Sequence, residues 1–180
     1  MSMSRRTIVV SAAAAALAQG AAYLLYRRVK ARRSASAEPL VFEQMDGGVR
    51  GLDARLDSRS GAEMRLREAL GQPLLVHFWA TWCEPCRTEL PELLALRRPR
   101  LLLVSVDEGW AVVDHFFANA VPAQVVLDVE GDTRRAFGVT TLPDTYLLDA
   151  DGRPLARFHG PRAWQRDSAR STLERLATAR

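Results

Sequence analysis

The chain has 180 residues, of which 48% are hydrophobic and 26% are charged. This composition fits one globular domain plus a further segment and excludes disorder over most of the length. The net charge of +4 is uneven, because residues 1–33 hold seven basic and no acidic side chains. The rest of the chain has 18 basic and 21 acidic side chains, so its charge gives no reason to expect a nucleic-acid partner.

Two cysteines are too few for a disulfide framework or a four-cysteine zinc site. The three histidines, His77, His115 and His159, are scattered along the chain, and none stands at metal-ligand spacing from the cysteines. We therefore expect no metal site.

The N-terminal segment contains a long uncharged run. Thr7–Tyr26 spans 20 residues without a charged side chain, and arginines flank both of its ends. As a helix this run is about 30 Å long, enough to cross a hydrocarbon core. We therefore expect residues 1–33 to form a transmembrane signal-anchor with basic flanks.

A cleaved signal peptide is the alternative, because Ala16-Leu17-Ala18 satisfies the small-x-small rule and Arg5-Arg6 resembles a twin-arginine signal. The run continues well past that cleavage point, which favours the anchor. A lipoprotein anchor is excluded, since no cysteine lies near residue 20. The five cations after the run favour a cytoplasmic body, whereas the chemistry argued below favours the opposite side of the membrane.

Residues 34–39 read as a linker, and residues 40–180 as the folded domain. Buried strands alternate with helices, and a hairpin and an amphipathic helix close the chain, which predicts an α/β fold with a mixed central sheet flanked by helices. Strands are expected at Leu40–Met45 and Val49–Leu56 (a hairpin-like pair), Leu74–Trp79, Leu101–Val106, Gln124–Leu127, Thr145–Leu148 and Leu155–Phe158. Helices are expected at Ala62–Leu70, Cys83–Leu96, Trp110–Ala118, Asp132–Phe137 and Arg162–Ala177.

The two cysteines stand at the start of a predicted helix that follows a buried strand. Cys83 falls at the helix N-terminus, where free backbone N–H groups and the helix dipole stabilise a thiolate. Cys86 is within disulfide-bonding reach of Cys83, one turn further along and less exposed. We therefore assign Cys83 as the attacking thiol and Cys86 as the resolving thiol, with no cofactor beyond this redox-active pair.

Three neighbours of Cys83 have expected roles. Trp82 adjoins it on a surface loop, where it borders the site at which a substrate docks. Pro85 suits the first turn of a helix. The charge of Glu84 opposes thiolate formation on Cys83 and so tunes its reactivity. The other interpretations of the cysteine pair are half of a zinc knuckle, which lacks a second pair, and a copper(I) site on the same thiolates.

The segment Phe78–Pro91, with the sequence FWATWCEPCRTELP, resembles the active-site signature of thioredoxin-like thiol–disulfide oxidoreductases. It looks most like the membrane-anchored TlpA/ResA branch, which is linked to cytochrome c maturation. Leu142–Asp149, with the sequence LPDTYLLD, resembles the cis-proline loop and following strand of that family. The resemblance spans about residues 40–178 and implies a thioredoxin-like fold.

The resemblance implies roles for further residues. Pro143 matches the cis-proline that faces the dithiol, in a loop with Leu142 that binds peptide substrates. Pro91 matches a kink in the active-site helix. Glu89 matches a glutamate that relays protons near the dithiol, although a solvated helix carboxylate is an equal interpretation.

His77 departs from the pattern of thioredoxins proper, which carry a buried aspartate at this place. An imidazole here can carry protons near neutral pH. It can equally be a core histidine hydrogen-bonded to backbone.

These residues predict a protein-disulfide reductase that acts outside the cytoplasm on client proteins with disulfides. The resemblance implies a cytochrome c maturation-like role, a membrane attachment through the N-terminal helix and an upstream membrane dithiol donor. Reduction potential sets the direction, so an oxidant or isomerase would use the same dithiol. A copper(I) metallochaperone and a thiol peroxidase are the alternative functions.

Overall fold

The computed structural model describes residues 40–45, 48 and 51–178 of the chain. These residues belong to one compact unit that begins at Leu40. The expected signal-anchor and linker, over residues 1–39, lie outside the described residues. Within the described ranges, no helix is both long enough and apolar enough to cross a membrane.

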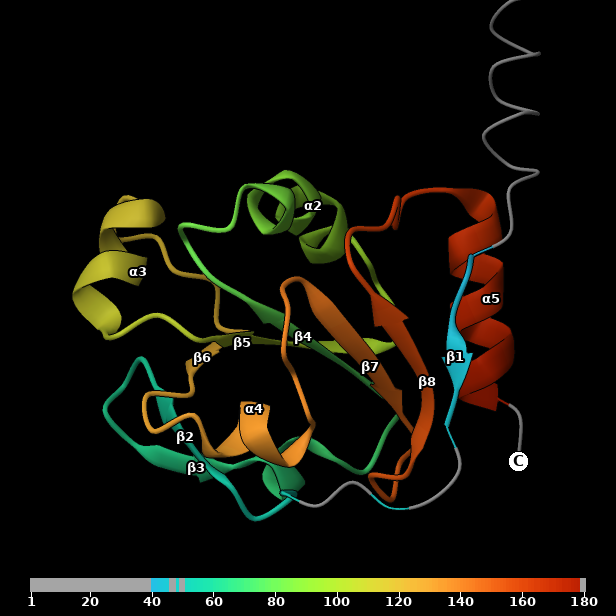
Figure 1. The fold of residues 1–180 in the computed structure, drawn as a ribbon, viewed down its shortest axis with the longest axis horizontal. Coiled ribbons are helices and arrows are strands. Elements are labelled where there is room, and N and C mark those ends of the chain that lie inside the picture. Colours follow the sequence, from blue (N-terminus) through green and yellow to red (C-terminus); the bar gives the residue numbers. More distant parts are fainter. Residues whose placement is uncertain (1–39, 46–47, 49–50, 179–180) are drawn as a thin grey trace, which may run out of the picture. The chain divides into compact units, whose positions relative to one another are not determined.

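The described strands form one eight-stranded sheet in the order β1-β8-β7-β4-β5-β6-β2-β3 (Figure 1). Their bounds are β1 Glu43–Gln44, β2 Arg55–Ser58, β3 Glu63–Arg65, β4 Leu74–Trp79, β5 Arg100–Ser105, β6 Val125–Leu127, β7 Asp144–Leu148 and β8 Pro154–His159. Strands β4, β5 and β6 run parallel to one another, and every other pair is antiparallel. The predicted mixed sheet is therefore confirmed.

Helices cover both faces of this sheet. Figure 1 shows α2 and α4 on opposite sides of the central strands, so the sheet is the middle layer of an α/β sandwich. The helices are η1 Leu66–Ala69 (a 3₁₀ turn), α2 Glu84–Leu94, α3 Trp110–Phe116, α4 Asp132–Ala136 and α5 Asp167–Thr178.

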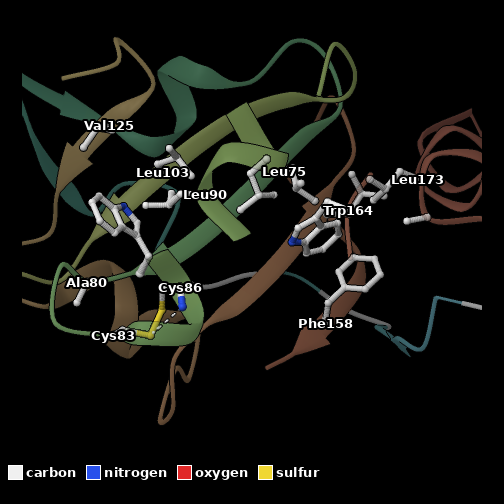
Figure 2. Close-up of a cluster of buried hydrophobic side chains, with 14 of the residues drawn as sticks. Leu75, Ala80, Cys83, Cys86, Leu90, Leu103, Val125, Phe158, Trp164 and Leu173 are labelled. Atoms are coloured by element: carbon white, nitrogen blue, oxygen red, sulfur yellow. Dashed lines mark hydrogen bonds between the residues drawn. A yellow bond between two sulfur atoms is a disulfide. The ribbon is translucent and has the colours of Figure 1, made fainter. Parts of the chain in front are cut away.

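Strand β4 is central, and all six of its side chains are buried. Because side chains alternate across a strand, Leu75 and Trp79 join the cluster that includes residues of α2, α3 and α5, whereas Leu74, Val76 and Phe78 join the cluster on the other face. Figure 2 shows the first cluster, with the two cysteines among its members. By the same alternation, His77 belongs to the α2 face.

The predicted hairpin between Leu40–Met45 and Val49–Leu56 is wrong. Strand β1 instead pairs with β8, with Glu43 opposite Arg157. Strand β2 begins only at Arg55 and pairs with β3 and β6. A turn closed by the Ala54 N–H and the Gly51 carbonyl precedes it and occupies residues expected to be extended.

The predicted helix at Ala62–Leu70 is also wrong in its first half, which forms the edge strand β3. Met64 lies opposite Leu56 of β2, and a 3₁₀ turn then buries Leu66 and Ala69 in the second cluster. The apolar residues of this stretch are spaced in a way that suits either a helix or a strand. Pairing with β2 selects the strand for its first half.

The closing helix begins later than expected, at Asp167 rather than Arg162. The backbone N–H groups of Arg162 and Gln165 donate to the carboxylates of Glu89 and Glu92 on α2. The segment before α5 is therefore bonded to α2 and does not continue α5.

Candidate active site

Cys83 lies in the loop between β4 and α2, directly before the first residue of α2. It is the N-cap residue of α2, with extended backbone angles, and its Sγ accepts the Cys86 N–H at 3.3 Å. The two sulfurs form a disulfide with an S–S distance of 2.04 Å (Figure 2). Cys83 retains 6% of its surface and Cys86 none, so Cys83 is the sulfur that a partner can reach.

A buried carboxylate fixes the loop before Cys83. Asp107 accepts the Thr81 N–H at 2.9 Å and the Thr81 hydroxyl at 2.8 Å, and it also accepts the Ser105 hydroxyl at 2.7 Å. Sequence reasoning missed Asp107. Its position just after β5, which runs parallel to β4, was an available signal, because parallel strands end at the same sheet edge.

A groove of about 580 Å³ opens beside Cys83. Trp82 stands at this groove with 69% of its surface exposed. Two chain segments form the walls, one around the cysteines and one from α4 to the start of β7. The lining residues are Trp82, Cys83, Glu84, Pro85, Val106, Arg134, Val139, Thr140, Thr141 and Leu142.

The Leu142–Pro143 peptide bond is cis, at the end of the second wall. Pro143 is buried, and its carbonyl accepts the Gly160 N–H at 2.9 Å, which ties the loop to the residue after β8. Leu142 is half-buried and lines the groove together with Cys83. The structure therefore brings the two sequence motifs to one surface.

An ion pair lies behind the same loop. Arg157 Nη2 donates to Asp144 at 2.6 Å and to the Gly138 carbonyl at 3.1 Å, while the Tyr146 hydroxyl donates to the Phe137 carbonyl at 2.6 Å. Asp144 is fully buried. Arg157 therefore joins the start of the loop, at Gly138, to its end, at Asp144. Sequence reasoning did not find this pair.

Glu89 is buried one turn after Cys86, with 3% of its surface exposed. Its Oε2 accepts the Arg162 N–H at 2.8 Å and the Trp164 indole N–H at 3.0 Å. Burial raises the pKa of Glu89 to about 7, against the opposing effect of these two hydrogen bonds. The interpretation of Glu89 as a solvated helix carboxylate does not fit this burial.

His77 is fully buried under α2. Its Nδ1 lies 2.8 Å from the Thr145 hydroxyl, and its Nε2 lies 3.5 Å from Glu89 Oε1. Its ring therefore contacts side chains rather than the backbone partner that a plain core histidine was expected to have. Burial lowers the pKa of His77 to about 3, which keeps the ring neutral at physiological pH.

The remaining predicted residues lie on α2. Glu84 and Pro85 form its exposed first turn and line the groove. Pro91 lies inside the helix and is exposed. No group of three or more His, Cys, Asp or Glu side chains within the described ranges is placed to hold a metal ion.

The chain is similar to proteins that are named for thiol–disulfide exchange. The chain is 26% identical over 125 residues to the thiol-disulfide oxidoreductase ResA of Bacillus thuringiensis, covering 66% of this chain and 72% of that protein. It is 41% identical over 106 residues to a thiol:disulfide interchange protein DsbE homolog of Paracoccus denitrificans, covering 52% and 55%.

A crystal structure of a thiol:disulfide interchange protein DsbE from Chlorobium tepidum matches with a TM-score of 0.60 at 28% identity, over 73% of this chain and 95% of that one. The predicted resemblance to thioredoxin-like thiol–disulfide oxidoreductases is thus confirmed. The sequence profile of the AhpC/TSA family matches residues 48–153, more than half of the chain, so this protein belongs to the AhpC/TSA family and has its thioredoxin-like domain.

Proposed function

We propose that this protein is a thiol–disulfide oxidoreductase that reduces disulfides of client proteins outside the cytoplasm. Its role would resemble that of the reductases that act in cytochrome c maturation. The observation that carries the proposal is the placement of Cys83. It caps α2, it is the one cysteine of the pair with exposed surface, and it opens onto a groove. The names of the ResA and DsbE relatives support the same activity.

The reaction is a two-step exchange of thiol and disulfide. The Cys83 thiolate attacks one sulfur of a client disulfide, a mixed disulfide forms, and the other client sulfur leaves as a thiolate that takes up a proton. Cys86 then loses its proton and attacks Cys83 Sγ, which releases the second client thiolate. The client gains two electrons and two protons, and this protein ends as the Cys83–Cys86 disulfide. An upstream dithiol donor at the membrane returns it to the reduced form.

Glu89 is proposed as the group that takes the proton from Cys86. It stands three residues after Cys86 on the same helix, and both side chains are buried, so water has little access to the proton. Its pKa of about 7 suits a group that both accepts and releases protons near neutral pH. His77 Nε2 lies 3.5 Å from Glu89 Oε1, and the neutral ring is proposed to orient the Glu89 carboxyl.

Trp82 and the loop ending in Leu142–Pro143 are proposed as the docking surface for the client, since they border the groove or adjoin it. An extended client segment would lie between them with its disulfide over Cys83. Glu84, exposed at the start of α2, is proposed to oppose thiolate formation and thereby tune the reduction potential.

Trapping tests the activity. A Cys86→Ser variant cannot resolve the mixed disulfide, so we expect client proteins to remain linked to Cys83 and to be released by added dithiol. A Cys83→Ser, Cys86→Ser double variant is the control. Nothing captured, together with peroxide turnover without a thiol partner or stoichiometric copper(I) retention, would contradict the proposal. A redox titration of the wild-type pair then gives the direction.

The location can be tested with the same variant, because Cys83 is then the only cysteine of the chain. A membrane-impermeant maleimide added to intact cells is expected to label it in the membrane fraction. Labelling that requires lysis would instead place the domain in the cytoplasm.

A further inference from the structure

The groove beside Cys83 has two walls. The wall opposite the cysteine motif carries one charged side chain. Arg134 of α4 is exposed and lines this groove, whereas the neighbouring Arg135 does not. Arg135 pairs with Asp132 at 2.5 Å on the helix surface. Among the residues that the structure describes, none forms an ion pair with the Arg134 guanidinium.

The backbone of Arg134 is fixed on both sides. Its N–H donates to Asp128 at 2.7 Å, and its carbonyl accepts the Val139 N–H at 2.9 Å. Asp128 is buried, and Val139 itself lines the groove. Figure 1 shows the loop after α4 running to the start of β7, so Arg134 stands at the beginning of the wall that ends at the cis-proline. The backbone that carries this cation is therefore held at a set place relative to the loop.

No other lining side chain on the wall of Arg134 carries a charge. Val139, Thr140, Thr141 and Leu142 are neutral, and Glu84 belongs to the opposite wall, next to Cys83. The two buried carboxylates of this region are already bonded, Asp107 to Thr81 and Ser105 and Asp128 to the backbone N–H groups of Thr133 and Arg134. A client segment in the groove thus meets a free cation on the α4 side and an anion on the α2 side.

We propose that Arg134 selects client segments that carry an acidic side chain near the disulfide to be reduced. The partner is a polypeptide with an Asp or Glu that lies against Arg134 while its disulfide lies over Cys83. This inference rests on the proposed oxidoreductase function and names a feature of its clients. Charge complementarity of this kind mainly affects the choice of partner and the association rate.

The test uses disulfide-linked peptides that differ at one position flanking the cysteine, with Glu, Gln or Lys. A series places the varied residue at successive positions on either side of the cysteine. The reduced full-length protein reacts with each peptide in a single turnover, and each second-order rate constant is divided by that for the uncharged 2-hydroxyethyl disulfide on the same variant. At the best position, we expect the Glu peptide to react about 5- to 10-fold faster than the Lys peptide at low salt, and less so at high salt.

Two arginine-to-glutamate variants with the same net charge separate the effect of Arg134 from a general effect of charge. Arg134→Glu is expected to reverse the preference, so that the Lys peptide reacts faster, and Arg134→Gln to remove it. Arg153→Glu changes an exposed arginine outside the groove, in the turn between β7 and β8, and is expected to keep the wild-type preference. Equal rates for all peptides on the wild type, or an equal loss of preference in both glutamate variants, would overturn the inference. No reaction with 2-hydroxyethyl disulfide would instead count against the proposed function itself.

Discussion

His77 Nε2 lies 3.5 Å from Glu89 Oε1, and both side chains are buried between β4 and α2. Neither atom has a hydrogen-bond partner within the described residues. Each atom therefore lies within reach of the other, and one proton between them would satisfy both. The pKa values agree with this arrangement, because burial disfavours the charged form of each side chain, imidazolium and carboxylate alike.

The two groups give opposite pH dependences of stability. The pKa of His77 falls from 6.5 to about 3 on folding, so the unfolded chain binds the extra proton between these values and stability rises with pH there. The pKa of Glu89 rises from 4.5 to about 7, so the folded chain binds the extra proton and stability falls with pH there. We expect the two contributions to cancel between about pH 4.5 and 6.5.

A Glu89→Gln variant removes the falling contribution alone. The difference in free energy of unfolding, variant minus wild type, should increase by about 3 kcal/mol from pH 4.5 to pH 7. Urea titration of the oxidised proteins measures this difference. Glu92→Gln, which removes a carboxylate from the same helix, is the control. A difference from wild type that stays constant over this range would show that Glu89 titrates normally.

The same variant should slow the second chemical step. Without a buried base, Cys86 must give its proton to water, so we expect resolution of the mixed disulfide to slow by about 10- to 100-fold near pH 7. The attack by Cys83 should change much less. Rapid quenching with a client peptide measures both steps, and an equal slowing of both would assign Glu89 a structural role.

Trp164→Phe should raise the pKa of Glu89 further. The indole N–H donates to Glu89 Oε2 at 3.0 Å, and this hydrogen bond favours the carboxylate. Phenylalanine keeps an aromatic ring against Phe158, 5.4 Å away between centroids, but removes the donor. We expect a rise of about one pKa unit, measured by the ¹³C chemical shift of the Glu89 carboxyl during a pH titration. An unchanged or lower value would contradict the role of this donor.

Asp144→Asn should destabilise the fold by about 3 kcal/mol, because it leaves the Arg157 guanidinium without its buried counter-charge. Asp132→Asn breaks the exposed pair with Arg135 and is the matched control, with an expected effect below about 1 kcal/mol. Urea titration of both variants makes the comparison. Equal effects would mean that the buried pair contributes no more than a surface pair.

The elements that the sequence predicts best are those with an unambiguous burial pattern. Leu74–Trp79 is a near-continuous apolar run, interrupted only by His77, and β4 has these bounds. The stretch Ala62–Leu70 is short and polar enough to suit two structures, so only its pairing with β2 decides that its first half is a strand. Local pattern cannot contain that information, because the partner lies elsewhere in the chain.

The same division holds for the site. Cys83 and Cys86 are separated by only two residues and stand at a helix start, so their geometry follows from local structure. The environment of Glu89 does not, since its hydrogen-bond donors come from Arg162 and Trp164, more than 70 residues away. A sequence pattern alone leaves that carboxylate equally suited to solvent and to the interior.

The attachment of Arg162 and Trp164 to Glu89 ties a late segment of the chain to the helix that carries the cysteine pair. No client need touch these residues for them to matter. Both residues follow the cysteine motif by more than 70 residues, yet the buried acid of α2 depends on their two donors to stabilise its charge. Arg162 and Trp164 thereby help to set the proton affinity of a carboxyl that lies one turn after a cysteine pair near the middle of the sequence.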